Sequence, residues 1–300
     1  MKTLIVGGAG FIGAATAYLL RSRGHDVTIA GRTPPAPGSP LADFDYARID
    51  YTQPEQDAAL LGGFDGLIFS AGNDVRHKPA QSGDEHWQSA NALAIPRFFA
   101  AARAAGIKRA VNVGSFYTLA APHLIETNPY IRSRRDAELG IAALAGPGFA
   151  AMSVNAPLVI GIVEGVSVPF FDSHVRFALG ELAPMPEFVP PGGVNFISVR
   201  SLAEAIVGGL ERGEGGKIYL VGDENLTFQQ YFGAYFAAAG RAPPPVLDEE
   251  APIFPDRSIY FGRGNTVFYE PDPEETRLLG YRRGDVIPSI HKMVAAYLQR

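Results

Sequence analysis

The chain has 300 residues, of which 47% are hydrophobic, with a net charge of −5 at pH 7 and no cysteine. This composition supports the core of one large α/β domain, alone or with a smaller lobe. The lack of cysteine excludes disulfides, thiolate metal sites and a cysteine nucleophile, and the acidic balance argues against nucleic-acid binding. Because the sequence has no signal peptide and no apolar run of about eighteen residues, we expect no membrane contact and a cytoplasmic location.

The first 32 residues predict a strand, a glycine-rich turn, a helix and a second strand. Gly7 allows a tight turn, Gly10 lets the backbone approach a pyrophosphate, and Gly13 lets the helix pack closely on the strand. Because the helix also presents free N–H groups to phosphates, the unit predicts a dinucleotide site. An ordinary strand-to-helix turn is the alternative. The four parts are a strand at 3–6, the turn Gly7-Gly8-Ala9-Gly10-Phe11-Ile12-Gly13, a helix at 14–20 and a strand at 27–30.

Strands and helices continue to alternate as far as residue 160. This alternation predicts a parallel, doubly wound sheet with helices on both of its faces, the Rossmann arrangement. Ligands of such sheets bind beyond the carboxyl ends of the strands. The expected strands lie at 47–50, 67–72, 110–115 and within 151–160, and the expected helices at 90–105 and 133–144.

The regular alternation fades over residues 161–193, which hold five prolines and four phenylalanines. These phenylalanines are either core residues or an apolar substrate wall. We expect residues 1–160 to form a dinucleotide-binding domain, to whose sheet residues 194–225 return, and residues 161–193 and 226–300 to form a substrate-binding lobe. The later elements are strands at 195–199 and 217–221 and helices at 202–210, 228–239 and 288–298.

A serine, a tyrosine and an arginine follow in an order that suits acid/base chemistry. Ser115 ends a predicted strand, and Tyr130 and Arg134 are four residues apart, so that they share one face of a helix. The pKa of a free phenol is near 10, and a neighbouring cation lowers it. A serine hydroxyl can hold a substrate oxygen while the tyrosine gives or takes its proton. The pattern therefore predicts hydride exchange with a nicotinamide cofactor.

The residues after the second strand bear on the choice of cofactor. NAD-binding proteins usually carry a carboxylate there, which binds the adenosine ribose hydroxyls. This chain has Gly31-Arg32-Thr33 instead. Arg32 can bind a 2′-phosphate, which favours NADP(H) over NAD(H). The alternative is that Arg32 is only a solvated loop residue.

Taken together, these residues make the chain resemble an extended short-chain dehydrogenase/reductase of the NAD-dependent epimerase/dehydratase type. The resemblance covers essentially the whole chain. The family's lysine, four residues after the tyrosine, is replaced by Arg134, which keeps the charge but is planar and longer. The matching segments are Gly7 to Gly13, Asp50, Ala71-Gly72, Asn91, Ser115, Tyr130 with Arg134 and Glu138, Pro157 to Gly161, Phe196 to Ala203 and Thr276 to Tyr281.

The resemblance also implies roles for individual residues. Ser115 and Tyr130 would be the catalytic hydroxyls, and Arg134 the cation that lowers the tyrosine pKa. The remaining implied residues belong to the cofactor site. They are Phe11 and Ile12 in the glycine turn, Asp50 near the adenine, Ala71 and Gly72 along the ribose and phosphate path, Asn91 in the helix behind the catalytic residues, and Pro157 and Val159 near the nicotinamide.

The sequence predicts an NADP(H)-dependent oxidoreductase that reduces a carbonyl or oxidises a secondary alcohol. A nucleotide-sugar epimerase or dehydratase is the first alternative, with Arg176, Arg257 and Arg263 as candidates for binding a diphosphate. A non-catalytic dinucleotide sensor is the second, because Arg134 replaces the family lysine. No pair of histidines has metal-ligand spacing, so we expect no metal. Family members often form dimers through two long helices, which here would be 90–105 and 133–144.

Overall fold

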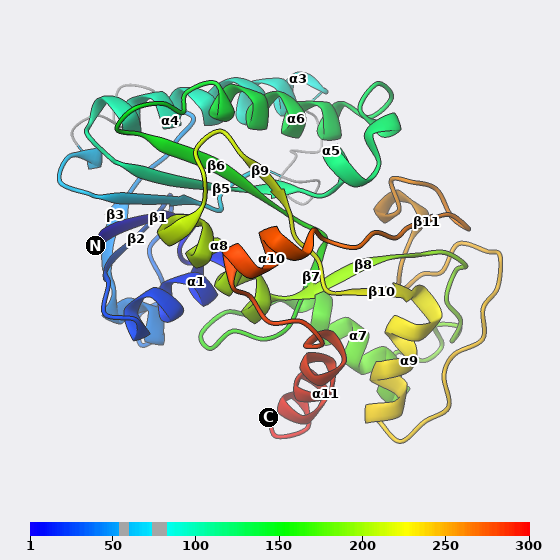
Figure 1. Ribbon diagram of the computed structural model, residues 1–300. Coiled ribbons are helices and arrows are strands. Elements are labelled where there is room, and N and C mark those ends of the chain that lie inside the picture. Colours follow the sequence, from blue (N-terminus) through cyan, green and yellow to red (C-terminus); the bar gives the residue numbers. More distant parts are fainter. Residues whose placement is uncertain (54–59, 74–82) are drawn as a thin grey trace.

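Seven parallel strands form the main sheet, in the order β3-β2-β1-β4-β5-β6-β9 (Figure 1). The computed structural model describes residues 1–53, 60–73 and 83–300. The strand order reverses beside β1, which is where dinucleotides bind in sheets of this kind. The strands are β1 (Lys2–Val6), β2 (Asp26–Gly31), β3 (Asp45–Arg48), β4 (Gly66–Phe69), β5 (Arg109–Ser115), β6 (Ala150–Ala156) and β9 (Ile218–Leu220).

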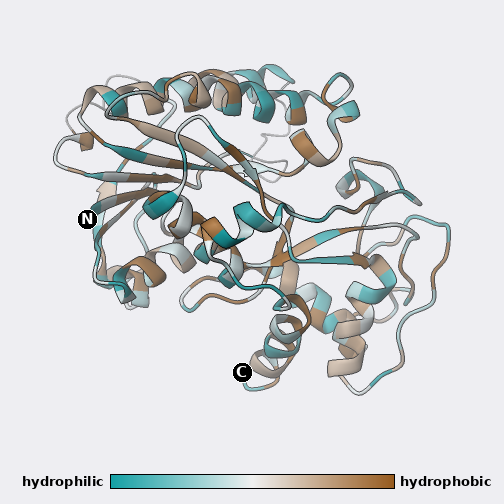
Figure 2. Ribbon diagram, in the orientation of Figure 1, coloured by the Kyte–Doolittle hydropathy of each residue, from teal (hydrophilic) through white to brown (hydrophobic). Residues whose placement is uncertain are grey.

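Helices cover both faces of this sheet. In Figure 1, α4 (Ala94–Ala104) and α6 (Pro129–Ala142) lie above it, and α1 (Phe11–Ser22) and α8 (Val199–Arg212) lie below. The central strands are consequently buried along almost their whole length, and the last three residues of β1 and all those of β4 are apolar (Figure 2). Among the described residues, no helix combines the length and the apolar character needed to cross a membrane. The expected doubly wound fold is confirmed.

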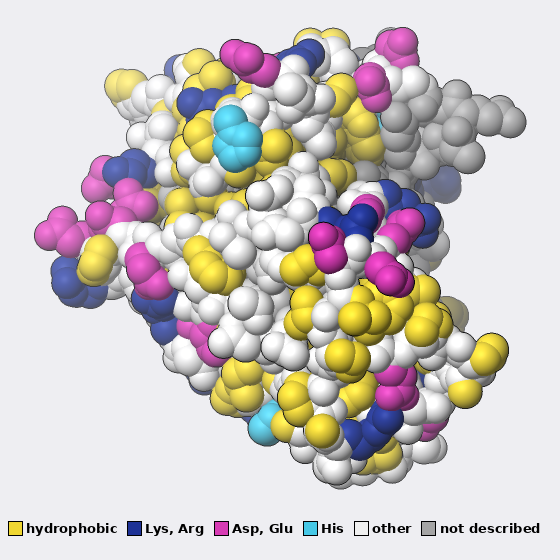
Figure 3. Space-filling model, turned by 90° about the vertical axis from the view of Figure 1, so that its right-hand side faces the viewer, with side chains coloured by type: hydrophobic (Ala, Val, Ile, Leu, Met, Phe, Trp, Pro, Cys, Tyr) yellow, Lys and Arg dark blue, Asp and Glu magenta, His cyan; other side chains and the backbone are white. Residues whose placement is uncertain are grey.

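A second, smaller sheet stands beside the first. Its central strand, β8, pairs with β7, β10 and β11. Hydrophobic side chains gather in the lower half of the end of the molecule seen in Figure 3. The strands are β7 (Leu158–Ile160), β8 (Gly193–Ser198), β10 (Glu224–Thr227) and β11 (Thr266–Val267), and the neighbouring helices are α7 (Pro169–Leu179), α9 (Phe228–Ala238) and α11 (Val286–Tyr297).

The phenylalanines of residues 161–193 belong mainly to the core of this second unit. Phe171, Phe177 and Phe188 are buried there, whereas Phe170 is exposed. His174 lies among the same aromatic rings, with Nδ1 3.0 Å from the Tyr231 hydroxyl, and burial lowers the pKa of the imidazole to about 3. This histidine is therefore neutral and packs as a core residue.

Several elements differ from those that the sequence predicts. The strand expected at 47–50 is β3, two residues earlier, and the strand expected at 67–72 ends at Phe69. The helix expected at 133–144 begins at Pro129, because Asn128 accepts a hydrogen bond from the backbone N–H of Ile131 and caps it. The short elements are α3 (Glu85–Trp87), a π-helical turn (Gln88–Leu93), α5 (Tyr117–Ala120), α10 (Pro273–Leu279) and 3₁₀ turns at Pro40–Asp43, Pro122–Leu124 and Asp256–Ser258.

Two further differences concern the second unit. Helix α7 lies in the irregular segment 161–193, for which we predict no helix. Residues 194–225 divide between the two sheets: β9 pairs with β6 in the main sheet, whereas β8 pairs with β7 in the second. Because β9 occupies the position beside β6, β8 pairs instead with β7, which follows β6 along the chain.

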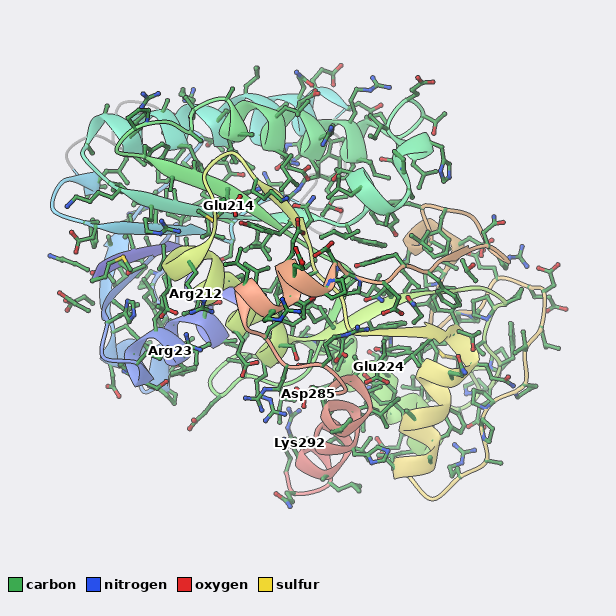
Figure 4. All side chains as sticks on the ribbon, in the orientation of Figure 1. Arg23, Arg212, Glu214, Glu224, Asp285 and Lys292 are labelled. Carbon is green, nitrogen blue, oxygen red and sulfur yellow. The ribbon has the colours of Figure 1, made fainter. Side chains whose placement is uncertain are left out.

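Carboxylates hold the start of α11 against the rest of the molecule. Asp285 accepts hydrogen bonds from Ser198 Oγ at 2.6 Å and Arg200 Nε at 3.0 Å. Glu224, labelled near it in Figure 4, accepts from the backbone N–H of Val286 at 3.1 Å. Burial favours a higher pKa for the Asp285 carboxyl, but the hydrogen bonds from Arg200 and Ser198 outweigh it and lower the pKa. The carboxylate form therefore stabilises the fold.

We expect Asp285→Asn to lower the free energy of unfolding by about 2 kcal/mol at neutral pH, because charge-assisted hydrogen bonds are lost. The loss should shrink as acid protonates Asp285 in the native protein, since a lowered pKa stabilises only above it. Urea unfolding over a pH series measures both effects. Asp172→Asn is the control, because Asp172 pairs with the exposed Arg300 and such pairs contribute little. Equal losses of unfolding free energy in the two variants would contradict the stabilising role of the Asp285 carboxylate.

Candidate active site

The candidate residues converge at one edge of the main sheet. Most of them lie at or just after the end of a strand, and the carboxyl ends of parallel strands meet at the same edge. This placement brings together groups from six different strands. They are Gly7 after β1, Arg32 after β2, Asp50 after β3, Ala71 and Gly72 after β4, Ser115 at the end of β5, and Pro157 after β6.

The glycine turn has the shape of a phosphate cradle. Gly7 adopts a positive φ of 83°, and a Cβ there would lie 2.9 Å from the backbone carbon of Ser70. A Cβ on Gly13 would lie 2.2 Å from the carbonyl oxygen of Gly7, so that α1 reaches the end of β1 only without one. Gly10 is exposed at the start of α1, and no side chain caps the helix there. The turn therefore fits a dinucleotide pyrophosphate.

The two apolar residues of this turn connect it to the two cores. The Phe11 ring lies 5.4 Å from that of Phe171 in α7, which joins the turn to the second unit. Ile12 packs against the core of the main sheet. Both side chains fix the position of the cradle relative to the two sheets.

Two arginines lie at the outer strands of this edge. Arg32 is exposed directly after β2, and Arg48 is exposed at the end of β3, paired in register with Gly31. The sequence does not indicate Arg48, because only the strand register places it beside Gly31, the residue before Arg32. Asp50 is half-buried, and its Oδ1 accepts hydrogen bonds from the backbone N–H and the hydroxyl of Thr52.

Tyr130 lies in the first turn of α6, among aromatic rings from other parts of the chain. Its ring is 5.2 Å from Trp87 and 5.6 Å from Tyr260, which in turn lies 5.5 Å from Tyr117. Burial, with smaller effects of Tyr130 and Tyr260, raises the pKa of the Tyr117 phenol well above its usual value. Tyr117 therefore stays neutral, and Trp87 and Tyr260 are neighbours of Tyr130 that the sequence did not indicate.

Arg134 points from α6 toward the sheet. Its side chain is buried, and Nη2 donates to the carbonyl oxygen of Val113 in β5. Its Nη1 lies 2.0 Å from where a Cβ on Gly72 would stand. The guanidinium thus fills the space that the glycine leaves open after β4.

Asn91 lies in the π-helical turn that precedes α4, a local irregularity that is frequent at functional sites. It is fully buried. Its Oδ1 accepts a hydrogen bond from the backbone N–H of Asn73, and its Nδ2 donates to the carbonyl oxygen of Asn73, both at 3.1 Å. It also donates to Ser133 Oγ, which donates to the carbonyl oxygen of Tyr130. Asn91 therefore ties the loop after β4 to the first turn of α6.

Pro157 and Val159 border the site where β6 continues into β7. Pro157 is buried, and Val159 is half-buried and pairs in register with Ile197 of β8. These two residues connect the main sheet to the second one.

The comparisons with known proteins agree with this geometry. The model of the "NAD dependent epimerase/dehydratase family" matches residues 3–222. The chain belongs to this family. It is an NAD(P)-dependent enzyme, as the resemblance implies. It is 25% identical to the UDP-glucose 4-epimerase of Corynebacterium glutamicum over 253 residues, which are 72% of this chain and 73% of that protein.

Solved structures show the same fold. The crystal structure of gox2253 superposes with a TM-score of 0.80 at 21% identity, over 99% of this chain and 98% of that one. A UDP-glucose 4-epimerase from Stenotrophomonas maltophila, with bound NAD and formylated UDP-arabinopyranose, has a TM-score of 0.73 at 18% identity, over 100% and 99% of the two chains. The whole described arrangement of this chain therefore has counterparts among epimerase structures.

We expect Gly72→Ala and Arg134→Lys to be coupled by about 1 kcal/mol in the free energy of unfolding. A methyl group on Gly72 displaces the arginine Nη1, and a lysine at this position lacks the branch that causes the clash. Urea unfolding of the two single variants and the double variant measures the coupling. Gly146→Ala, where a Cβ meets nothing within 4 Å, is the control and should be additive with Arg134→Lys. If the losses of unfolding free energy caused by Gly72→Ala and Arg134→Lys were additive, the guanidinium would not lie against Gly72.

Proposed function

We propose that the chain is an NADP(H)-dependent oxidoreductase that reduces a carbonyl or oxidises a secondary alcohol. The observation that carries the choice of cofactor is the exposed Arg32 after β2, where Gly31 and Thr33 flank it and no carboxylate is present. Arg48, on the neighbouring strand, offers a second cation for a 2′-phosphate. Charged hydrogen bonds to phosphate are the strong ones, so both arginines favour the phosphorylated cofactor.

The proposed roles follow from the edge of the sheet at which these residues lie. A bound nicotinamide supplies the hydride donor or acceptor. The Ser115 hydroxyl holds the substrate oxygen, and the Tyr130 phenol gives or takes its proton. The positive charge of Arg134, one helical turn from Tyr130, favours the phenolate. Asn91 keeps the first turn of α6 in place through Ser133.

The aromatic surroundings of Tyr130 bear on the substrate. Trp87 and Tyr260 both lie within ring-contact distance of it. Aromatic surfaces contribute apolar area and little affinity for anionic groups. We therefore propose a carbonyl compound whose neighbouring group is apolar or aromatic, held between the sheet edge and a lobe of residues 161–193 and 226–300.

A nucleotide-sugar epimerase is the second candidate, favoured by the likeness to the UDP-glucose 4-epimerase of Corynebacterium glutamicum. Such an enzyme needs cations for the substrate diphosphate. Arg176 already pairs with Glu181 at 3.7 Å and Arg263 with Asp248 at 3.2 Å, whereas Arg257 is exposed on its 3₁₀ turn. These pairs leave Arg257 as the best placed of the three arginines for a diphosphate.

We also propose a cytoplasmic enzyme that forms a homodimer through α4 and α6. Leu93, at the start of this pair, and Leu139 in α6 are 62% and 49% exposed. Large apolar side chains on neighbouring helices are typical of an interface.

We expect Arg32→Ala to weaken NADPH binding about tenfold or more and to leave NADH binding unchanged, because the lost bond is to the 2′-phosphate. Calorimetric titration with each cofactor measures both affinities. Arg103→Ala is the matched control, since Arg103 is exposed at the last turn of α4. If wild type prefers NADH, or if both affinities fall together, the NADP(H) proposal is wrong.

We expect Tyr130→Phe to lower kcat by a factor of about 10² or more while NADPH affinity stays the same, because the ring remains and only the acid/base group is lost. NADPH consumption across a carbonyl panel measures the rate, and Tyr297→Phe in α11 is the control.

An assay with UDP-glucose as the substrate, together with the cofactor titration, separates the alternatives. Conversion of UDP-glucose to UDP-galactose without net NADPH consumption would favour the epimerase. Tight NADPH binding with no turnover of either kind would favour a non-catalytic sensor.

A further inference from the structure

A buried carboxyl group lies behind the candidate site without contacting it directly. Glu138 follows Arg134 by one turn of α6 and is 1% exposed. Both of its carboxyl oxygens lie 3.0 Å from the Thr118 hydroxyl of α5, and Oε1 lies 2.9 Å from Nδ2 of Asn155 in β6. Buried carboxyl groups are rare, and this one connects three elements around the end of β5.

Thr118 links this carboxyl to Ser115. Its hydroxyl lies 3.1 Å from the backbone carbonyl oxygen of Ser115 and accepts from Asn155 Nδ2 at 3.0 Å. The hydroxyl therefore faces three acceptors, which are the Ser115 carbonyl and the two oxygens of Glu138. It has one proton to donate.

The number of protons available for these hydrogen bonds differs between the ionised and the protonated form of Glu138. If Glu138 is ionised, the Thr118 proton goes to the charged carboxylate and the Ser115 carbonyl loses that donor. If Glu138 is protonated, its O–H donates to Thr118, Thr118 donates to Ser115, and Asn155 donates to the other carboxyl oxygen. In the protonated form each of these groups has a hydrogen-bond partner, whereas the ionised form leaves the Ser115 carbonyl oxygen without the Thr118 proton. Buried polar groups normally have a partner, which favours the protonated form.

We propose that Glu138 is a positioning residue that, as a neutral carboxylic acid, holds Ser115 in place through Thr118. The hydrogen-bond relay fixes the turn between β5 and α5, on which the Ser115 hydroxyl stands. The effect on turnover rests on the proposed function of Ser115, whereas the protonation of Glu138 does not.

Burial favours the neutral state of Glu138 more strongly than the two neighbouring cations, Arg134 and Arg135, oppose it. Burial raises the pKa of Glu138 to about 7, and the Thr118 hydrogen bond and the charge of Arg134 oppose it less strongly. Arg135 Nη1 lies 3.8 Å from Oε2. Both cations belong to α6 itself, whereas the residues that face Glu138 from α5 and β6, Thr118 and Asn155, carry no charge.

The sign of the pH effect follows from this raised pKa. The native protein keeps the proton between the ordinary glutamate pKa of 4.5 and about 7, where an unfolded chain has lost it. The contribution of Glu138 to stability is therefore fully present at the acidic end of this range and is lost as the pH rises to about 7. Above that pH, the relay to Ser115 weakens.

Glu138→Gln tests the state of the carboxyl, because its amide donates to Thr118 as the neutral acid does but cannot ionise. In the protein without cofactor or substrate, we expect the Tm of wild type minus that of Glu138→Gln to fall from about pH 5 to about pH 8. A difference that does not change with pH would overturn the proposal. This measurement of Tm does not depend on enzyme activity, so it can contradict the proposed state of Glu138 while the proposed function stands.

A second arm tests the link to Ser115. We expect Glu138→Ala to lower kcat about tenfold with unchanged NADPH affinity, and Glu138→Gln to keep the wild-type kcat. We also expect the kcat of wild type to fall above about pH 7, and that of Glu138→Gln not to fall. Thr118→Val, which breaks the relay but keeps the side-chain shape, should lower kcat like Glu138→Ala. Loss of activity in Glu138→Gln at every pH would show that the carboxylate itself is required and would overturn the proposal.

Discussion

The site depends on the close approach of α1 to the end of β1. Gly13 lies so near Gly7 that a Cβ would come within 2.2 Å of the Gly7 carbonyl oxygen. Because the two backbones touch, the open start of α1 stands over the edge at which the parallel strands end. A larger residue at either position would move the helix away and remove the cradle. The groups after the other strands would then have no dinucleotide to face.

Helix α6 supplies the second half of the site from a single face. Tyr130, Arg134 and Glu138 are spaced by four residues, so they lie one above another. The first packs among aromatic rings, the second reaches Val113 and Gly72, and the third reaches Thr118. In the proposed roles, a proton donor, a cation and a neutral acid are thereby arranged in order along one helix. Any shift of α6 would move all three together.

The sequence predicts the part of the molecule whose signals are local. The glycine spacing from Gly7 to Gly13, the strand that ends at Ser115 and the four-residue spacing of Tyr130 and Arg134 are each contained in a few residues. The alternation of strands and helices predicts the doubly wound sheet on the same grounds. These features needed no knowledge of distant contacts.

The remaining features depend on contacts between distant segments. Trp87 and Tyr260 contact Tyr130 from positions 43 residues before it and 130 residues after it in the chain. The neighbourhood of Arg32 and Arg48 follows from strand register, and the separate sheet of β8 follows from β9 occupying the place beside β6. The sequence does not predict helix α7, because prolines interrupt the segment in which it lies, at the first residue of the helix and beyond its end. The π-helical turn at Asn91 differs from an α-helix by a local change that apolar spacing does not report.

The central claim is that this edge binds a dinucleotide with its nicotinamide end at Tyr130. The most direct test is a crystal structure of the protein with NADP⁺. The account predicts the pyrophosphate at the start of α1, the 2′-phosphate at Arg32 and the nicotinamide ribose on the side of Arg134 and Tyr130. A dinucleotide bound elsewhere, or one whose nicotinamide end points away from α6, would contradict it.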